Sequence, residues 1–317
     1  MSVFTPVTRG QLEQFLQSFE LGRLVEHRDI VAGAENSNFF VVTDQGQFVL
    51  TLVERGPVAE LPFIIELLGY LQGVGLPVPY AIADRHGQRL HQLNDRPALL
   101  QPCLVGRHVL EPDASHCRAV GTVLARLHKV TLASDLHRHS DRGLVWMEQE
   151  LVRRSAAADQ SKAQLLQSML VEVREIQSNM QGLPSGVLHG DLFRDNVLFE
   201  GHHLSGIIDF YNAASGPLLY DVAICVNDWC IAEDGGLDAA RVSALLGGYA
   251  SVRPFTPAEA QRWPALLRIA ALRFWLSRLQ AADEHRGQAG VLCKDPNYFL
   301  QLLITLQALS PSLPMAL

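Results

Sequence analysis

Lysine is scarce in this chain. Only three lysines occur among 317 residues (Lys129, Lys162 and Lys294), and the net charge is −7. A nucleic-acid surface needs clustered lysine and arginine side chains, and docking on an anionic membrane needs a basic run. The composition therefore argues against both a nucleic-acid partner and a membrane partner.

Cysteine is also rare, and long apolar runs are missing. The five cysteines form no Cys-x-x-Cys pair, which indicates reduced thiols and argues against a zinc site. No stretch reaches the roughly 18 consecutive apolar residues that a membrane-spanning helix needs. The N-terminal residues also lack the pattern of a signal peptide. We therefore expect a cytoplasmic protein; the sequence predicts no particular oligomeric state.

The chain contains enough apolar residues, 48%, for a sizeable core. Up to residue 102, alternating patterns predict strands, with one helix at 11–21 and another near 59–73. From residue 103 onward helical spacing dominates. We therefore predict an α+β protein of two lobes: an antiparallel-sheet lobe over residues 1–102 and a mainly helical lobe over 103–317. The strands are expected at 24–31, 39–43, 47–53, 89–93 and 98–104, and the later helices at 115–130, 144–180, 219–231, 237–250, 257–281 and 296–308.

Residues 187–199 read VLHGDLFRDNVLF, a polar segment between two apolar triplets. A short β-hairpin is predicted to follow, and it brings Asn196 and Asp209 to the same open end. Residues directly opposed in a hairpin lie about 5 Å apart, so both side chains can reach one ion. Magnesium prefers such oxygen ligands. Asp221 is expected to start the next helix and to tie it to this segment.

Asp191 lies in the loop that enters this hairpin, and its carboxylate can accept the proton of an attacking hydroxyl group. A base, an amide and a metal-binding acid are the parts that kinases use for phosphoryl transfer. The alternative is structural: Asp191 caps a turn, and Asp209 only ends a strand.

Three motifs together resemble the signature of the aminoglycoside phosphotransferase and choline kinase superfamily. They are residues 189–192 (HGDL), 196–198 (NVL) and 207–210 (IIDF). The resemblance implies a two-lobed protein-kinase-like fold that uses ATP and Mg²⁺ to phosphorylate a small molecule. It also implies that Asp191 is the catalytic base and that Asn196 and Asp209 are the metal ligands.

A narrower set of strings resembles the bacterial homoserine kinases of this superfamily: residues 48–52 (FVLTL), 60–63 (ELPF), 191–196 (DLFRDN), 209–211 (DFY), 226–230 (VNDWC) and 272–279 (LRFWLSRL). This resemblance implies ATP-dependent phosphorylation of the hydroxyl group of L-homoserine to O-phosphohomoserine, a step towards threonine. Two alternatives remain. One is a kinase for another small alcohol, such as choline or an aminoglycoside. The other is a nucleotide-binding regulatory module without catalysis.

The regulatory alternative is motivated by Thr51, which stands in the third strand where most kinases of this fold have a basic residue. The loop at 33–38 is therefore expected to face the phosphates, with backbone N–H groups as donors. Backbone groups near Gln101 and Cys103 are expected to contact the adenine. The nucleotide candidates are thus Asn36, Ser37, Asn38, Gln101 and Cys103.

Homoserine carries an ammonium group, a carboxylate and the hydroxyl group that is phosphorylated. Its pocket needs opposite charges on the helical lobe. Asp228 is a candidate for the ammonium group, and Arg194 or Arg273 for the carboxylate, because guanidinium binds carboxylate bidentately. Tyr211 and Asn227 are candidates for further hydrogen bonds.

Overall fold

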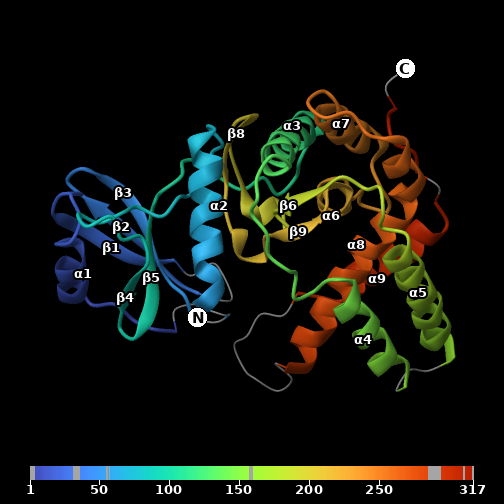
Figure 1. Ribbon diagram of the computed structural model, residues 1–317, viewed down its shortest axis with the longest axis horizontal. Helices are drawn as coiled ribbons and strands as arrows, with labels where there is room; N and C mark the ends of the chain where they lie inside the picture. The colour runs from blue at the N-terminus through green and yellow to red at the C-terminus, as the bar shows by residue number, and fades with distance from the viewer. Residues whose placement is uncertain are drawn as a thin grey trace. The chain divides into compact units, whose positions relative to one another are not determined.

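A computed structural model describes residues 4–30, 36–54, 56, 58–156, 160–284, 294–309 and 311–315 (Figure 1). The chain forms two compact units. The first comprises Met1–Gly106 and Ser205–Ile208, and the second comprises Arg107–Leu204 and Asp209–Leu317. The assignment of residues 1–102 to nucleotide binding and of 103–317 to catalysis stays a prediction.

The first unit is built on a five-stranded antiparallel sheet with the strand order β1-β2-β3-β5-β4. In β2 every second side chain is buried, the pattern of a strand with one face on the core. The strands are β1 (Leu24–Ile30), β2 (Ser37–Thr43), β3 (Gly46–Leu52), β4 (His91–Leu93) and β5 (Arg96–Pro102).

Two helices belong to this unit. Helix α1 (Arg9–Leu16) starts at a capping box in which Thr8 and Gln11 bond each other's backbone N–H groups. Its buried side chains join those of β1, β2, β3 and β5 in one apolar core. Helix α2 (Leu61–Gly73) begins after a 3-10 turn (Val58–Glu60), carries Pro62 in its first turn, and buries the leucine-rich face that the sequence predicts.

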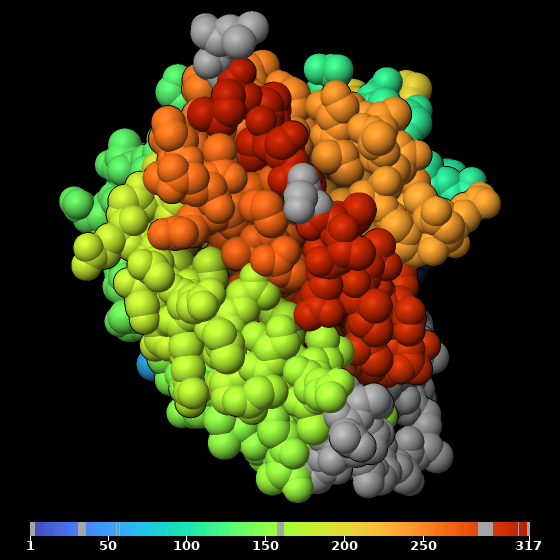
Figure 2. All heavy atoms as spheres, turned by 90° about the vertical axis from the view of Figure 1, so that its right-hand side faces the viewer, coloured from blue at the N-terminus to red at the C-terminus, as the bar shows by residue number. Residues whose placement is uncertain are grey.

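The second unit is mainly helical, as predicted. Its helices are α3 (Ala114–Thr131), α4 (Leu144–Ser155), α5 (Gln160–Ser178), α6 (Leu218–Trp229), α7 (Ala239–Ala250), α8 (Pro257–Glu284) and α9 (Asn297–Gln307). The stretch at 144–180, predicted to be helical, consists of the two helices α4 and α5. Helices α5 and α9 lie side by side on one face of this unit (Figure 2), where Gln307 Nε2 lies 3.9 Å from Met169 Sδ. No helix of the described ranges is both long enough and apolar enough to cross a membrane.

Short strands frame the polar segment around residue 191. The predicted hairpin forms from β7 (Val197–Glu200) and β8 (His203–Ile207). A second pair, β6 (Ser185–Leu188) with β9 (Ala214–Pro217), is antiparallel and was not predicted. Each strand of that pair has only four residues, too few to show a period. The residues between the two pairs include two 3-10 turns, Arg194–Asn196 and Phe210–Asn212.

Helices α3 and α7 approach closely because glycines lie at their contact. A Cβ atom on Gly248 would lie 2.3 Å from Arg118 O, and one on Gly121 would lie 2.0 Å from Leu245 O. In both cases the obstacle is a backbone atom of the other helix, which cannot move without separating the helices.

Gly248→Ala should therefore destabilise the protein by about 1–3 kcal/mol, the usual cost of overpacking. Gly247→Ala on the same helix is the control, because its Cβ would meet only Arg118 Nη1, at 3.7 Å. The control should be neutral or slightly stabilising, since alanine favours helix over glycine. Urea unfolding of both variants measures the difference, and equal stabilities would contradict the close contact.

Candidate active site

The loop between β6 and β7 carries Asp191 in a conformation that depends on the residue before it. Gly190 has φ = +76°, and a Cβ atom there would lie 2.6 Å from Asn212 O. Both facts restrict this position to glycine. The loop then turns tightly, with Phe193 N–H donating to Asp191 O at 2.8 Å.

A buried carboxylate on α6 holds this loop. Asp221 Oδ2 accepts from His189 N at 2.8 Å, and Asp221 Oδ1 accepts from Gly190 N at 2.9 Å. The prediction that Asp221 ties the start of α6 to the loop is therefore confirmed. Burial works to raise the pKa of Asp221, but the hydrogen bond and charge of His128, with the backbone donors, lower it below its ordinary value.

The bonds to Asp221 continue away from the loop through side chains on α3 and α7. His128 Nε2 lies 3.0 Å from Asp221 Oδ2, and His128 Nδ1 lies 2.8 Å from Tyr249 Oη. An ionised Asp221 only accepts, so Nε2 carries the proton and Nδ1 accepts from the phenol. Arg253 Nη1 then donates to Tyr249 Oη at 3.3 Å and to the fully buried Glu259 at 2.9 Å.

Asp191 itself is half-buried and lies among like charges. Burial is the largest cause that raises its pKa, and the charges of Asp209 and Asp195 add to it. Arg273 opposes them, and the pKa of Asp191 is raised to about 8. Asn212 Nδ2 lies 3.4 Å from Asp191 Oδ2. The charge of the predicted metal ligand Asp209 therefore acts on the predicted base.

The second predicted metal ligand, Asn196, is bonded to the same loop. Its Nδ2 donates to Asp191 O at 2.8 Å, so its Oδ1 points away from that carbonyl. Asp209 has φ = +64°, a strained backbone conformation that is concentrated at functional sites. Carboxylate and amide oxygens are donors that suit a hard divalent cation, so the assignment of Asn196 and Asp209 as metal ligands stays a prediction.

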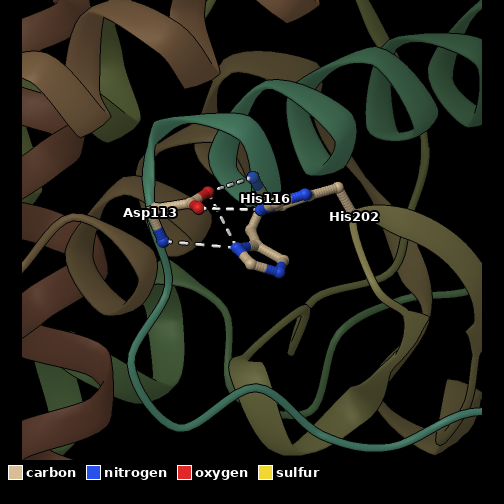
Figure 3. Close-up of side chains that lie close together, drawn as sticks. All are labelled: Asp113, His116 and His202. Atoms are coloured by element: carbon tan, nitrogen blue, oxygen red, sulfur yellow. Dashed lines mark hydrogen bonds and ion pairs between the residues drawn. The ribbon is translucent and has the colours of Figure 1, made fainter.

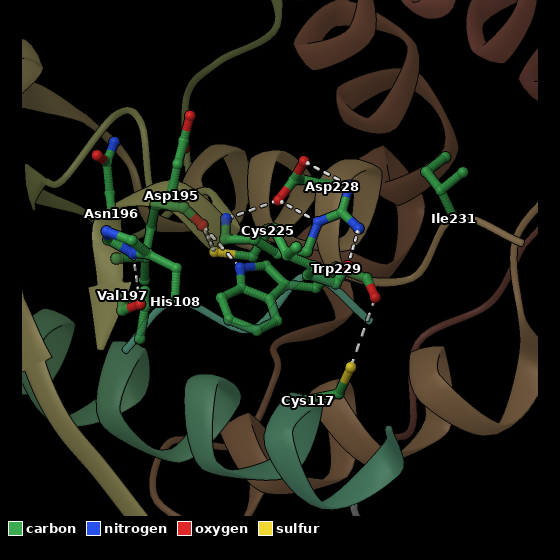
Figure 4. A network of polar contacts seen from close by, with 12 residues as sticks. His108, Cys117, Asp195, Asn196, Val197, Cys225, Asp228, Trp229 and Ile231 are labelled. Atoms are coloured by element: carbon green, nitrogen blue, oxygen red, sulfur yellow. Dashed lines mark hydrogen bonds and ion pairs between the residues drawn. The ribbon is translucent and has the colours of Figure 1, made fainter. Parts of the chain in front are cut away.

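The predicted substrate residues Asp228 and Arg194 pair with each other (Figure 4). Arg194 N donates to Asp228 Oδ2 at 2.8 Å, and Arg194 Nε lies 3.3 Å from the same oxygen. The start of α6 holds the loop through Asp221, and its end does so through this pair. Trp229 Nε1 also donates to Leu192 O at 3.0 Å.

Asn227 and Tyr211 lie deeper than the sequence suggested. Asn227 is fully buried and donates to Leu267 O at 2.8 Å, which joins α6 to α8. Burial, together with the charge of Asp209, raises the pKa of the Tyr211 phenol. Their predicted contacts with substrate stay predictions.

Arg273 is 4% exposed and contacts the catalytic loop directly. Its Nη1 donates to Gly190 O, and its Nη2 donates to Asn212 Oδ1 at 3.2 Å. This bracing of the loop was not visible in the sequence, because α8 lies some 80 residues away from residue 190. A role of Arg273 in holding the substrate carboxylate stays a prediction.

A cavity of about 590 Å³ lies behind this part of the loop, between α4, α5 and α8. Trp146, Met147 and Met180 are among its apolar lining, and Gly190, Asn212 and Arg273 are on its polar side. The lining includes neither Asp191 nor Asn196 nor Asp209. The cavity thus adjoins the loop without containing the predicted reacting groups.

Asp113, His116 and His202 form a second polar cluster (Figure 3). Their ligand-type atoms lie within 4.8 Å of one another. Asp113 is the N-cap of α3, where it accepts from Ser115 N and His116 N, and both imidazoles lie within 2.9 Å of its oxygens. The positive end of the α3 dipole disfavours a cation here. Helix capping therefore accounts for the cluster.

The nucleotide candidates in the first unit lie around the end of β2. Ser37 Oγ accepts from Phe4 N and Thr5 N and donates to Glu54, while Asn36 Oδ1 accepts from Glu54 N at 3.1 Å. Across the sheet, Thr51 Oγ1 donates to Asn38 Oδ1 at 2.7 Å. The remaining part of the loop, residues 33–35, lies outside the described residues.

The two adenine candidates lie in β5 and directly after it. Gln101 Nε2 donates to Pro79 O at 2.6 Å, and Cys103 N donates to Gln47 O at 3.0 Å. Contacts of these five residues with a nucleotide stay predictions.

Solved structures of small-molecule kinases share this fold. Amicoumacin kinase hAmiN has a TM-score of 0.70 at 15% identity, covering 98% of this chain and 96% of that one. A microcompartment-associated aminopropanol kinase has a TM-score of 0.69 at 18% identity, covering 95% and 97%. The predicted kinase-like α+β fold is therefore confirmed.

The sequence comparisons define the family more closely. The profile of the phosphotransferase enzyme family matches residues 26–255. The chain is 53% identical to the homoserine kinase of Pseudomonas aeruginosa (strain LESB58) over 317 residues, the full length of both. It is 43% identical over 305 residues to the homoserine kinase of Methylobacillus flagellatus, covering 96% of this chain and 94% of that protein. The chain thus belongs to the phosphotransferase enzyme family, as its motifs indicated.

Asp221→Asn should lower the free energy of unfolding by about 3–5 kcal/mol at neutral pH, because it breaks a buried charged network. The pKa of Asp221 is depressed in the folded state. Its stabilising contribution is therefore complete above the unfolded pKa of about 3.9, and it is lost as the pH falls through the folded pKa.

Urea unfolding from pH 7 down to pH 3 measures this contribution. The stability difference between wild type and Asp221→Asn should narrow below about pH 4. The exposed turn residue Asp234, changed to Asn, is the matched control and should follow the wild-type curve. A difference that stays constant down to pH 3 would contradict the assignment.

Proposed function

We propose that this chain transfers the γ-phosphoryl group of ATP to the hydroxyl oxygen of L-homoserine, giving O-phosphohomoserine and ADP. The reaction is a step towards threonine. The observation that carries the proposal is the full-length identity of 53% to a homoserine kinase. An identity of this size over the full length supports a shared fold, and with it the proposal that Asp191 serves as the base.

Asp191 is the proposed proton acceptor. It lies on a loop that is fixed by Asp221 on one side and by Arg273 on the other. A base held in this way needs no reorganisation when the substrate hydroxyl group arrives, and proximity of this kind accounts for a large part of enzymatic rate enhancement. Arg273 also keeps a positive charge near the carboxylate and so favours its ionised, proton-accepting form.

Asn196 and Asp209 are the residues that would hold Mg²⁺. When bound, the ion neutralises charge on the phosphates. The like charges of Asp191 and Asp209 raise the pKa of Asp191, and a cation held by Asp209 would relieve this repulsion. These three residues therefore depend on one another electrostatically as well as through the bond from Asn196 to the Asp191 carbonyl.

ATP is proposed to bind through the first unit. Asn36, Ser37 and Asn38 are the candidates for the phosphates, and Gln101 and Cys103 are the candidates for the adenine. Because β3 has Thr51 and no lysine, we propose that backbone N–H groups and the metal ion neutralise the negative charge of the phosphates.

Asp191→Asn should reduce turnover with homoserine by at least about 10³-fold, because an amide cannot accept the hydroxyl proton; general-base contributions are typically 10²–10⁴-fold. The Kd for ATP, measured by calorimetry, should stay within a few-fold of wild type. Asp234→Asn makes the same chemical change at an exposed turn and should keep full activity. Full activity of Asp191→Asn would contradict the assignment of the base.

ADP release against homoserine, choline, an aminoglycoside and a small sugar tests the substrate. Homoserine should give the highest kcat/KM, since Asp228 and Arg194 supply the opposite charges that its ammonium and carboxylate groups need. ADP release with another alcohol but not with homoserine would contradict homoserine as the substrate, while the assignment as a kinase would stand. ATP binding without turnover of any alcohol would favour the alternative of a regulatory module.

A further inference from the structure

Four side chains from four segments of the second unit meet near the catalytic loop. They are Arg194 of the loop, Asp228 of α6, Arg278 of α8 and Tyr298 of α9. Burial raises the pKa of the Tyr298 phenol, and the charges of the other three residues act on it as well. All four groups therefore lie within electrostatic reach of one another, and we call them the α6–α9 polar cluster.

The cluster shares a segment of the chain with the proposed proton acceptor. Arg194, which pairs with Asp228, stands three residues after Asp191 in the same loop. A small molecule bound at the cluster would therefore contact the loop that carries Asp191.

Among the described residues, ion pairs join four of the charges in and around the cluster. Arg194 pairs with Asp228 at 3.3 Å, and Lys294 pairs with Asp195 at 2.7 Å. For Arg278 the described residues provide one acceptor, the carbonyl of Asp295, at 2.8 Å from Nη1. Burial is the largest influence on the pKa of Arg278 and lowers it, while the charges of Asp228, Asp295 and Asp195 raise it. Because charges that lose water are normally paired, a carboxylate bound directly to this guanidinium would offset the cost of burial.

Two aromatic rings also fix the orientation of the Arg278 guanidinium group. Its guanidinium lies over the rings of Phe299 and Tyr298, with distances of 4.5 Å and 5.2 Å to the ring centroids. Such stacking fixes the plane of the group and leaves N–H donors at its edge. Beside it, Tyr298 Oη is buried, and no group of the described residues accepts its proton. The guanidinium and the phenol O–H are neighbouring hydrogen-bond donors, and donors of this kind suit an anion.

We propose that Arg278 binds the carboxylate of the acceptor substrate, with Tyr298 Oη as a second donor. The proposal rests on the proposed function, because homoserine has this carboxylate and the amino alcohols phosphorylated by other kinases lack it. A guanidinium binds a carboxylate bidentately, and a site built for a polar group discriminates strongly against analogues without it. Arg278 then decides the substrate class: amino-acid alcohols are accepted and simple amino alcohols are rejected.

The experiment compares homoserine with homoserinol, which has CH₂OH in place of the carboxylate. Wild type, Arg278→Gln and Arg278→Lys are assayed for KM and kcat, and binding of each acceptor is measured by calorimetry. Arg278→Gln should raise the KM for homoserine by about 30- to 1,000-fold, the usual effect of losing one partner of a desolvated charge pair. The KM for homoserinol should change less than about three-fold, by the same reasoning. The KM of Arg278→Lys for homoserine should lie between those of wild type and Arg278→Gln, because lysine keeps the positive charge but lacks the planar guanidinium group.

Arg126→Gln is the matched control, since Arg126 is exposed on α3 away from the cluster. Its kinetics should equal those of wild type. Tyr298→Phe should weaken the binding of homoserine, but not that of homoserinol, by about 3- to 10-fold, the effect of losing one hydrogen bond. The KM for ATP should be unchanged in every variant. A rise in the KM for ATP instead would assign Arg278 to the phosphates and overturn the proposal.

The outcomes separate this proposal from the proposed function. If wild type turns over homoserine but Arg278→Gln weakens the binding of homoserine and homoserinol equally, the proposed contact with the carboxylate is wrong and the proposed function stands. If wild type binds homoserine, selectively and through Arg278, without phosphorylating it, the contact stands and the function is wrong. If wild type does not bind homoserine at all, both are wrong.

Discussion

The hydrogen bonds from the backbone of residues 189 and 190 to the buried carboxylate of Asp221 are the constraint on which the active site depends. Asp221 holds the N–H group of Gly190, and Arg273 holds its carbonyl. The absence of a side chain at Gly190 lets the loop touch the backbone of Asn212. The direction of the next residue, Asp191, is thereby fixed from three sides. A loop without these bonds would have to be ordered by the substrate itself, at a cost in binding free energy.

The arrangement of charge around this loop follows one rule. Acids are concentrated near Asp191, and two of them form ion pairs with a cation from a different segment: Asp228 with Arg194, and Asp195 with Lys294. Burial and the charge of Asp209 raise the pKa of Asp191, and the charge of Arg273 lowers it. Arg278 is half-buried, and among the described residues no carboxylate forms an ion pair with it. In the proposed reaction, Asp209 would hold a metal ion and Arg278 would hold an anionic group of the substrate.

The sequence predicted the parts of this account that depend on local pattern. The hairpin, the helices with clear apolar spacing and the tie between Asp221 and the loop follow from short stretches of residues. The bracing by Arg273 and the buried bonds from His128 to Glu259 join segments far apart in the chain, so no local period signals them. The pair of β6 and β9 was missed because four-residue strands leave too short a pattern. The stacking of Arg278 on α9 becomes visible only when the two helices are packed.

The central claim of the proposed function is that a carboxylate held in this way accepts the proton of an alcohol, whose oxygen takes the γ-phosphoryl group of ATP. ³¹P NMR of the protein with ATP, Mg²⁺ and L-homoserine tests it most directly, because the spectrum identifies the phosphorylated product as well as ADP. The account predicts a new phosphomonoester resonance, coupled to a CH₂ group, that grows as the γ-phosphate resonance of ATP disappears. Inorganic phosphate as the only new product, or an unchanged spectrum, would contradict it.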